Sequence, residues 1–457
     1  MDKSFLLKKS AIVLFAVVLA FLFVFFLPFE EKTNKGLALL VLVAILWLTE
    51  AVHITITALL VPVGAILLGL EKTKPALEAF ANPTIFLFFG GFAIATALSV
   101  QKLDKYIAAK VLSMAKGNFF VAILLLFSVT ALLSMGISNT ATAAMMIPLA
   151  IGMLKQLDYQ NNKNTYAFVI LGIAYSASIG GMGTIVGSPP NAIVASHLHL
   201  TFSDWLKYGT PVMIVLMPLL ILVLFLIFRP KMNIKIETQL HTEKLNSKQY
   251  LTILIFAVTA LCWITGSWLN PTFSNLLGID KIGDYDSIVA LMATILICGL
   301  GVAHWKQIQD NTDWGVLMLF GGGLTLSAVL TSSGASKAMV DSVVFLIEGK
   351  HFYLIGLLVA MFIIFLTEFT SNTASAALLV PIFISIAKEL NMLPLGLTMI
   401  IGLGASCAFM LPVATPPNAI AYGTGMIEQR SMIRAGFVLN IVCILFIATI
   451  AYYFWFE

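Results

Sequence analysis

The tripeptide Ser-Asn-Thr occurs twice in this chain, at 138–140 and at 371–373, each time inside a long apolar run. Polar groups without partners are costly at the depth of a lipid bilayer, so such an island persists where it faces protein, water or a bound ion. Two further motifs are repeated around it in the same order: Phe-Gly-Gly at 89–91 and 320–322, and Pro-Pro-Asn at 189–191 and 416–418. The offsets are nearly equal (320 − 89 = 231, 371 − 138 = 233, 416 − 189 = 227). The chain is therefore an internal duplication, and each half carries one polar island.

The composition excludes a soluble domain, because 60% of the 457 residues are hydrophobic and only 11% are charged. Apolar runs near the roughly 20 residues that a helix needs to cross a bilayer recur along the chain. We therefore predict an all-α polytopic membrane protein. The net charge of +4 comes mostly from loops and indicates no nucleic-acid partner. The four cysteines have spacings that suit neither a metal site nor a disulfide framework, so free thiols are expected at Cys262, Cys298, Cys407 and Cys443.

The apolar pattern predicts about eleven transmembrane helices and two re-entrant hairpins. The expected helices are at about 11–27, 36–51, 54–70, 83–101, 210–228, 249–269, 286–302, 314–331 and 433–455. Two more are expected to be broken: one starts near Tyr166 and breaks at 180–183 and 187–190, and the other runs over about 395–425. The hairpins are expected at 119–154 and 352–388, with a basic interfacial helix at 101–116 and a connecting helix at 334–348.

The duplication predicts the domain order. An N-terminal transmembrane helix (1–35) precedes a first repeat (36–228), a cytoplasmic loop (229–248) and a second repeat (249–457). With the N-terminus in the cytoplasm, 17 of the 26 Lys and Arg residues lie inside, and eleven crossings put the C-terminus outside. Five crossings separate equivalent points of the two halves, so the repeats are inverted. Inverted repeats with broken helices are typical of secondary transporters whose site lies near the membrane midplane.

The residue types at the hairpin tips suit a cation and an anion together. Where one helix ends it presents free carbonyls, and where the next begins it presents free N–H groups. Ser134 to Asn139 offers hydroxyl, carbonyl and amide oxygens for sodium, while Thr140 begins a helix start that can bind an anion. Ser188 and Thr415 are suitable N-caps before the proline pairs. Lys and Arg are absent from the two tips and the two breaks, so the anion should bind weakly until the cation is present.

Simpler interpretations exist for each motif alone. A single Ser-Asn-Thr in a membrane helix is usually a helix–helix hydrogen bond, and a single Pro-Pro-Asn is usually a kink. Duplication of both motifs in inverted halves favours a site. Glu50 and Glu368 could carry protons, although each lies near a helix end where backbone N–H groups can hold it. His197 and His199 have no carboxylate or Cys partner at ligand spacing, so we expect solvated loop histidines.

Together these motifs resemble the divalent anion/sodium symporter family over nearly the whole chain. The resemblance rests on the paired Ser-Asn-Thr tips, the Pro-Pro-Asn breaks, and the stretches 47–51 (Trp-Leu-Thr-Glu-Ala) and 57–62 (Thr-Ala-Leu-Leu-Val-Pro). His53 departs from the family pattern, where a proline is expected after Thr-Glu-Ala.

The resemblance implies specific site residues. Sodium site 1 would use Ser134, Ser138, Asn139 and Gly187, and sodium site 2 would use Thr367, Thr370, Asn372 and Ala414. Contacts to the substrate carboxylates would come from Ser138, Asn139, Thr140, Ser188, Pro189, Ser371, Asn372, Thr373, Thr415 and Pro416. It also implies a homodimer that moves as an elevator, with scaffold helices at 36–118 and 249–350 and transport elements at 119–228 and 351–457.

The expected function is sodium-coupled import of C4-dicarboxylates such as succinate, malate and fumarate across the cell (plasma or inner) membrane. Partners would be sodium ions, the dicarboxylate, membrane lipid and a second copy of the chain. Members of the same family that exchange dicarboxylates without sodium, or carry sulfate or tricarboxylates, remain alternatives. An anion channel is a further alternative. A membrane-embedded hydrolase finds no support, since no Ser-His dyad or paired aspartates occur at the midplane, and we expect no enzyme.

Overall fold

The computed structural model describes residues 3–231, 244–347 and 351–456, and all of the regular structure in these ranges is helical. Seven of the described helices are long and apolar enough to cross a membrane: Lys8–Phe26, Glu31–Thr49, Thr73–Val100, Phe202–Phe228, Ser247–Ile264, Trp314–Ser332 and Gln429–Phe454. The prediction of an all-α polytopic membrane protein is confirmed.

Most predicted helices are present, with shifted ends. The first half contains α1 (Lys3–Phe26), α2 (Glu31–Thr49), α3 (Ile54–Leu67), α5 (Pro83–Val100), α6 (Leu103–Ser113) and α11 (Phe202–Phe228). The second half contains α12 (Ser247–Ile264), α14 (Tyr285–Gly299), α16 (Trp314–Ser332), α17 (Ala335–Ile347) and α22 (Gln429–Phe454). Most of the predicted loop 229–248 lies outside the described residues, as does position 348 at the end of the predicted connecting helix.

Short helices account for the main errors of the prediction. α4 (Thr73–Glu78) with the 3₁₀ turn η1 (Ala79–Ala81), α13 (Gly266–Leu277) and α15 (Trp305–Asn311) were not expected. The prediction of one helix over 249–269 is wrong, because α12 ends at Ile264 and the chain bends at Thr265 into α13. The bend is held by tertiary contacts: Asn270 Nδ2 donates to Ile282 O at 3.0 Å, which ties α13 to the segment that returns toward α14.

Each predicted hairpin is a pair of helices that meet at the Ser-Asn-Thr tip. α7 (Phe119–Ser134) is followed by α8 (Asn139–Leu154), and α18 (Phe352–Leu366) is followed by α19 (Asn372–Glu389). The serine of each tip is the N-cap of the second helix. Ala141 N donates to Ser138 Oγ at 3.2 Å, and Ala374 N donates to Ser371 Oγ at 3.4 Å. The motif thus fixes where each second helix begins.

Each Pro-Pro-Asn motif begins the second part of a broken helix. α9 (Tyr159–Gly181) breaks before α10 (Pro189–Leu198), and α20 (Pro394–Gly404) breaks before α21 (Pro416–Gly423). The asparagine of each motif braces its break. Asn191 Nδ2 donates to Gly181 O (2.8 Å) and Thr184 O (2.7 Å), and Asn418 Nδ2 donates to Ala408 O (2.9 Å) and Leu411 O (3.0 Å). In each half, the asparagine side chain therefore satisfies carbonyl groups that have lost their helical partners at the break.

The two halves of the chain interlock. α3 of the first half packs on α16 of the second, and α14 of the second packs on α5 of the first. The approach is close enough to require glycine: a Cβ on Gly90 would lie 2.7 Å from Ala290 O, and one on Gly322 would lie 2.6 Å from Ala58 O. Both pairs share one offset (322 − 90 = 232, 290 − 58 = 232). The Phe-Gly-Gly motifs therefore serve close packing.

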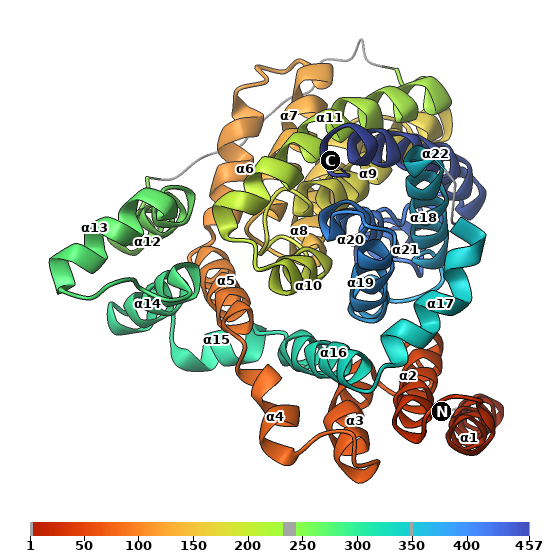
Figure 1. Ribbon diagram of the computed structural model, residues 1–457. Coiled ribbons are helices and arrows are strands. Elements are labelled where there is room, and N and C mark those ends of the chain that lie inside the picture. Colours follow the sequence, from red (N-terminus) through yellow and green to blue (C-terminus); the bar gives the residue numbers. More distant parts are fainter. Residues whose placement is uncertain (1–2, 232–243, 348–350, 457) are drawn as a thin grey trace.

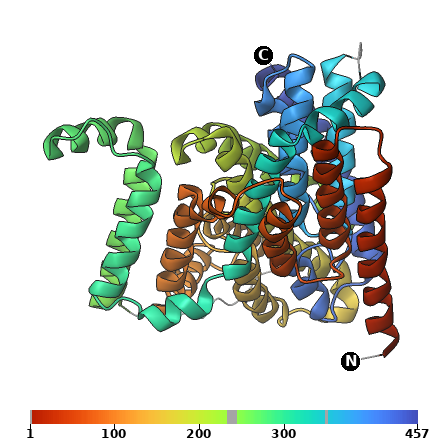
Figure 2. The same ribbon diagram turned by 60° about the horizontal axis from the view of Figure 1, so that its bottom comes forward.

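The helices form two groups, which Figures 1 and 2 show from two directions. The frame group is α1–α6 with η1 and α12–α17. Most of it runs along the left and bottom of Figure 1, while α6 lies beside α7 in the upper part and α17 lies on the right. The broken-helix group is α7–α11 and α18–α22, and it fills the upper right. Within it, α10 packs on α19 and α21 packs on α8, so each broken helix contacts the hairpin of the other half. These contacts between the halves bring both tips and both breaks close together.

Candidate functional site

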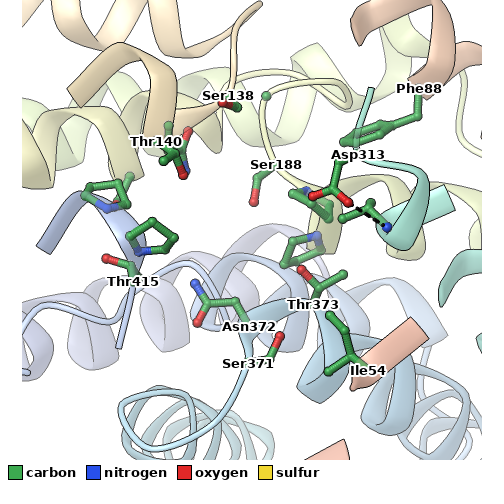
Figure 3. Close-up of a pocket in the computed structure, with 18 of the residues that line it drawn as sticks. Ile54, Phe88, Ser138, Thr140, Ser188, Asp313, Ser371, Asn372, Thr373 and Thr415 are labelled. Carbon is green, nitrogen blue, oxygen red and sulfur yellow. Dashed lines mark hydrogen bonds between the residues drawn. The ribbon is translucent and has the colours of Figure 1, made fainter. Parts of the chain in front are cut away.

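A cavity of about 550 Å³ lies where the two tips and the two breaks meet (Figure 3). Frame residues Ile54, Phe88 and Asp313 border it, at the start of α3, on α5 and before α16. All ten residues predicted to contact the anion line it: Ser138, Asn139, Thr140, Ser188, Pro189, Ser371, Asn372, Thr373, Thr415 and Pro416. Residues up to 278 positions apart in the sequence (416 − 138 = 278) thus line the same cavity.

Oxygen atoms cluster behind the first tip. Ser134 is fully buried, and its Oγ lies 2.5 Å from Asn139 Oδ1 and 2.7 Å from Ala177 O. We call Ser134, Asn139, Ala177 and Gly187 the first oxygen cluster. The Asn139 amide can present either end to it: turned with Nδ2 inward, it donates to Ala177 O (3.0 Å) and Gly187 O (3.3 Å). With Oδ1 inward, hydroxyl, amide and carbonyl oxygens converge, which is the ligand chemistry that sodium prefers at broken helices.

The second tip repeats this arrangement. Thr367 Oγ1 donates to Asn372 Oδ1 or to Ala405 O, the latter at 3.0 Å. We call Thr367, Asn372 and Ala405 the second oxygen cluster. The predicted sodium ligand Ala414 lines the cavity, as Asn372 does.

Two of the predicted sodium ligands lie apart from these hydrogen bonds. Ser138 is exposed at the cavity, and its hydroxyl caps α8. Thr370 Oγ1 lies 3.0 Å from Leu366 O and 2.8 Å from Ser375 Oγ, so it ties the hairpin together at its tip while lining the cavity. The structure therefore brings Ser134, Asn139, Thr367 and Asn372 together with carbonyls of the breaks, and leaves Ser138 and Thr370 beside them.

Sequence reasoning missed the carbonyl oxygens of Ala177 and Ala405. An alanine side chain gives no signal, because the oxygen that matters belongs to the main chain. The one available signal is symmetry: the offset of 405 − 177 = 228 is within one residue of the offset of 227 between the Pro-Pro-Asn motifs. Ser406 was also missed, and its Oγ lies 3.3 Å from Ser188 Oγ, which links the break of one half to that of the other.

The two acidic residues singled out in the sequence have different surroundings. Glu50 is exposed at the left-handed C-cap of α2 and borders the cavity. Glu368 is fully buried, and backbone N–H groups hold its carboxylate as expected.

The expected histidine placement is wrong for His197. It lies in the last turn of α10 with Nδ1 3.0 Å from Ile193 O, and not in a solvated loop. Within the described residues no group of three or more His, Cys, Asp or Glu side chains could hold a metal ion, and all four cysteines are free.

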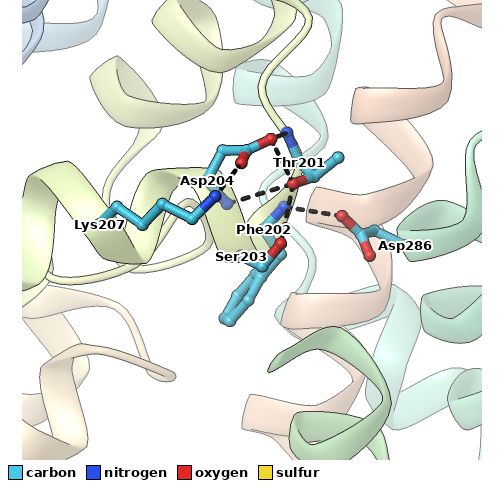
Figure 4. A network of polar contacts seen from close by, with 6 residues as sticks. All are labelled: Thr201, Phe202, Ser203, Asp204, Lys207 and Asp286. Atoms are coloured by element: carbon cyan, nitrogen blue, oxygen red, sulfur yellow. Dashed lines mark hydrogen bonds and ion pairs between the residues drawn. The ribbon is translucent and has the colours of Figure 1, made fainter. Parts of the chain in front are cut away.

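A contact between the two helix groups lies at the start of α11 (Figure 4). Phe202 N donates to Asp286 Oδ2 of α14 at 2.7 Å, and the Phe202 ring stacks on Trp263 of α12 with centroids 4.7 Å apart. Trp263 Nε1 in turn donates to Asp286 O at 2.9 Å. We call these three residues the α11 clasp.

The opposite end of the repeat lacks such a clasp. On α3 the residue equivalent to Asp286 is Ile54 (286 − 232 = 54, the offset of Ala290 and Ala58), whose apolar side chain offers no acceptor. Ile54 lines the cavity between the tips, whereas no clasp residue does, and Asp286 borders a separate cavity of about 750 Å³. The cavity between the tips therefore reaches the α3 end of the repeat and not the clasp.

Comparison with known proteins gives consistent matches over the whole chain. A family model described as "Sodium:sulfate symporter transmembrane region" matches residues 8–457. An uncharacterized transporter of Haemophilus influenzae is 64% identical over 451 residues, 98% of each chain. The sodium-dependent dicarboxylate transporter SdcS of Staphylococcus saprophyticus is 32% identical over 461 residues, 93% of this chain and 87% of that one. The structure of the Alcanivorax borkumensis YdaH transporter has a similar fold, with a TM-score of 0.57 at 13% identity over 83% of this chain and 87% of that one.

Proposed function

The chain belongs to the sodium:sulfate symporter family of membrane transporters, the divalent anion/sodium symporters, and on that premise we propose that it imports C4-dicarboxylates such as succinate, malate and fumarate together with sodium ions. One observation carries this proposal. Residues of both Ser-Asn-Thr tips and both Pro-Pro-Asn breaks line a single cavity of about 550 Å³. Two equivalent polar sets that face one space suit an anion with a carboxylate at each end.

The absence of fixed positive charge supports sodium coupling. No Lys or Arg belongs to the described residues that line the cavity. A dianion there would depend on helix starts, hydroxyl groups and nearby cations for its charge balance. Sodium in the two oxygen clusters would supply those cations directly behind the tips. Each asparagine would then give its Oδ1 to sodium and its Nδ2 to a carboxylate, so that the two ligands favour each other's binding.

The arrangement of the apolar lining favours a dicarboxylate over sulfate. Val186, Pro190, Val413 and Pro417 line the same cavity as the polar tips. Such side chains suit the carbon backbone of a C4 acid, whereas sulfate is a compact ion without an apolar part. A related transporter named as a sodium-dependent dicarboxylate carrier supports the same choice.

We propose an elevator mechanism in which the broken-helix group carries the site across the bilayer against the frame group of a homodimer. The cavity between the tips is lined by Ile54 at the start of α3 and by no residue of the α11 clasp. This supports a conformation in which the site is reached from one side of the membrane. With α3, α14 and the two broken pairs added to the seven long helices, eleven crossings would place the N-terminus in the cytoplasm and the C-terminus outside. The start of α1 and the end of α22 lie at opposite ends of the molecule, which agrees with an odd number (Figure 2).

Uptake of radiolabelled succinate into proteoliposomes tests the proposal. We expect accumulation against a succinate gradient when sodium is outside, and none when potassium or a proton gradient replaces sodium. A channel cannot accumulate its substrate uphill. Rapid sodium-independent exchange would replace the symport proposal with a dicarboxylate exchanger. Competition by sulfate or citrate without competition by succinate or malate would replace the substrate.

A further inference from the structure

Glu368 is the most completely satisfied buried acid in the described part of the chain, and neither oxygen cluster includes it. Its Oε1 accepts from Phe409 N (2.8 Å) and Met410 N (2.9 Å), and its Oε2 accepts from Met410 N and Leu411 N, both at 3.1 Å. Asn440 Nδ2 of α22 donates to Oε1 at 2.7 Å. This donor set suits a carboxylate, because a protonated acid would direct its own hydrogen at an N–H group.

The segment that Glu368 holds joins α20 to α21 and therefore belongs to the second break. Ala405, at the start of that segment, gives its carbonyl to the second oxygen cluster, and Ala414, near its end, lines the cavity. Glu368 also directly follows Thr367, the hydroxyl of that cluster. One carboxylate thus connects the hairpin tip to the main chain that must face it.

In the first half of the chain, the positions equivalent to Glu368 and Asn440 hold uncharged residues. The residues equivalent to Glu368 and Asn440 are Met135 (368 − 233 = 135) and Met213 (440 − 227 = 213). Both methionines lie at Gly183, the equivalent of Met410 (410 − 227 = 183): a Cβ there would be 3.0 Å from Met135 Cε and 3.0 Å from Met213 Sδ. The apolar Met–Met pair of the first half has therefore become a Glu–Asn pair in the second.

The hydrogen bonds of the main chain also differ between the two breaks. In the first break, Met182 N and Gly183 N donate to Ile179 O (3.1 Å) and Gly180 O (3.0 Å), so that segment satisfies its own N–H groups. In the second break, the equivalent N–H groups of Phe409 and Met410 go to Glu368. Buried N–H groups need acceptors, so the second break depends on this carboxylate for its conformation.

We propose that Glu368 is a positioning residue that shapes the second oxygen cluster and whose negative charge makes that cluster the tighter of the two sodium sites. The proposal rests on the proposed function, since it assumes that both clusters bind sodium. A negative charge buried in a medium of low dielectric attracts a nearby cation more strongly than it would in water. The first cluster has no such charge in its Met–Met counterpart, so sodium should fill the second cluster first.

The test compares two variants that loosen the same segment, only one of which removes charge. Glu368→Gln keeps the size of the side chain but replaces one acceptor oxygen with an NH₂ group that faces N–H donors. Tyr175→Phe removes a different buried bond to this segment, from Tyr175 Oη to Phe409 O at 2.6 Å, and changes no charge near sodium. Sodium titrations of succinate uptake, and of the Tm of purified protein without succinate, are recorded for both variants.

We expect Glu368→Gln to raise the half-saturating sodium concentration at least tenfold in both titrations, while Tyr175→Phe stays within twofold of the unchanged protein. Succinate KM at saturating sodium should change less than threefold. If Glu368→Gln is not recovered as a monodisperse protein, Glu368→Asp, which keeps the charge and shortens the side chain by one methylene, should give a shift between the two.

Other outcomes would overturn the proposal. Equal shifts for Glu368→Gln and Tyr175→Phe would make Glu368 a purely structural brace. An unchanged sodium titration together with loss of pH dependence between about pH 6 and 8 would make it a proton carrier instead. If the unchanged protein itself shows no sodium dependence, then the proposed function fails first, and this result is separate from any variant.

Discussion

Asn139 and Asn372 each belong to an oxygen cluster and also line the cavity. The coupling of sodium binding to substrate binding should therefore depend on them most. Replacing either with Ala would remove a proposed sodium ligand and a proposed carboxylate donor at once. A buried group left without its partner costs about 1–3 kcal/mol, and more when it is charged. We expect a tenfold or greater loss of sodium affinity together with loss of transport, measured as succinate KM at several sodium concentrations.

Thr140→Ala and Thr373→Ala are the matched comparison for these asparagines. Both threonines line the cavity, but neither belongs to an oxygen cluster. They should raise succinate KM while the half-saturating sodium concentration changes little. If Asn139→Ala transports with an unchanged sodium dependence, the first tip is a structural hydrogen bond and the site assignment is wrong.

How far the sequence could predict the site depends on which atoms form it. The tips and breaks were predictable because capping by Ser138 or Ser371 and the start of a helix at Pro-Pro are local events. The carbonyls of Ala177 and Ala405 were not, because they join the clusters through packing between elements. The contacts of Glu368 with three distant N–H groups likewise have no trace in local sequence.

At the scale of elements, the pairing of α5 with α14 gives a stability prediction. Gly90→Ala would place a Cβ 2.5 Å from Ala290 Cβ and 2.7 Å from its carbonyl oxygen, so the helices must separate. Overpacking of this kind typically costs about 1–3 kcal/mol, and we expect a lower Tm in detergent.

Gly152→Ala in α8 is the control for this change. A Cβ there meets nothing within 4 Å, and an alanine within a helix is favoured over glycine by about 0.5–1 kcal/mol. Its Tm should stay the same or rise. A Gly90→Ala protein as stable as the control would contradict a role of Gly90 in the close α5–α14 contact.

The α11 clasp predicts a change in rate without a change in binding. Asp286→Ala removes the acceptor of Phe202 N, yet Asp286 does not line the cavity. If the broken-helix group moves against the frame group, this bond must break in each cycle. We expect the maximum uptake rate to change by about two- to tenfold while succinate KM stays constant, because net hydrogen-bond contributions of about 0.5–1.5 kcal/mol correspond to such factors.

Asp286→Asn serves as the comparison, since its amide oxygen can still accept from Phe202 N. It should behave like the unchanged protein in initial-rate measurements. A change in KM with a constant maximum rate would place the effect at the binding site and contradict the role of the clasp.

Element boundaries were less predictable than the motifs. The apolar run 249–269 reads as one span, but the chain turns at Thr265 because Asn270 bonds to Ile282 O on a returning segment. α4 and α15 were missed for a different reason. Helices of six and seven residues are too short to show the hydrophobic periodicity of a helix.

For the whole molecule, the proposed eleven crossings predict termini on opposite sides of the membrane. Alkaline phosphatase fused after position 457 should be active in the bacterial periplasm, while green fluorescent protein fused before position 1 should be fluorescent. Fluorescence from the same protein fused after position 457 would require an even number of crossings.

The interlocking of the halves has a consequence for biogenesis. Gly90 and Ala290 are 200 residues apart, and Ala58 and Gly322 are 264 residues apart (290 − 90 = 200, 322 − 58 = 264), yet each pair is in close contact. α3 and α5 therefore enter the membrane long before the ribosome has made the helices that cover them. Contacts between such distant segments form late, and the early helices expose the faces that make these contacts until then. The first half should consequently depend on insertion factors or chaperones during synthesis, and a chain truncated before α14 should be degraded rather than persist as a half-sized carrier.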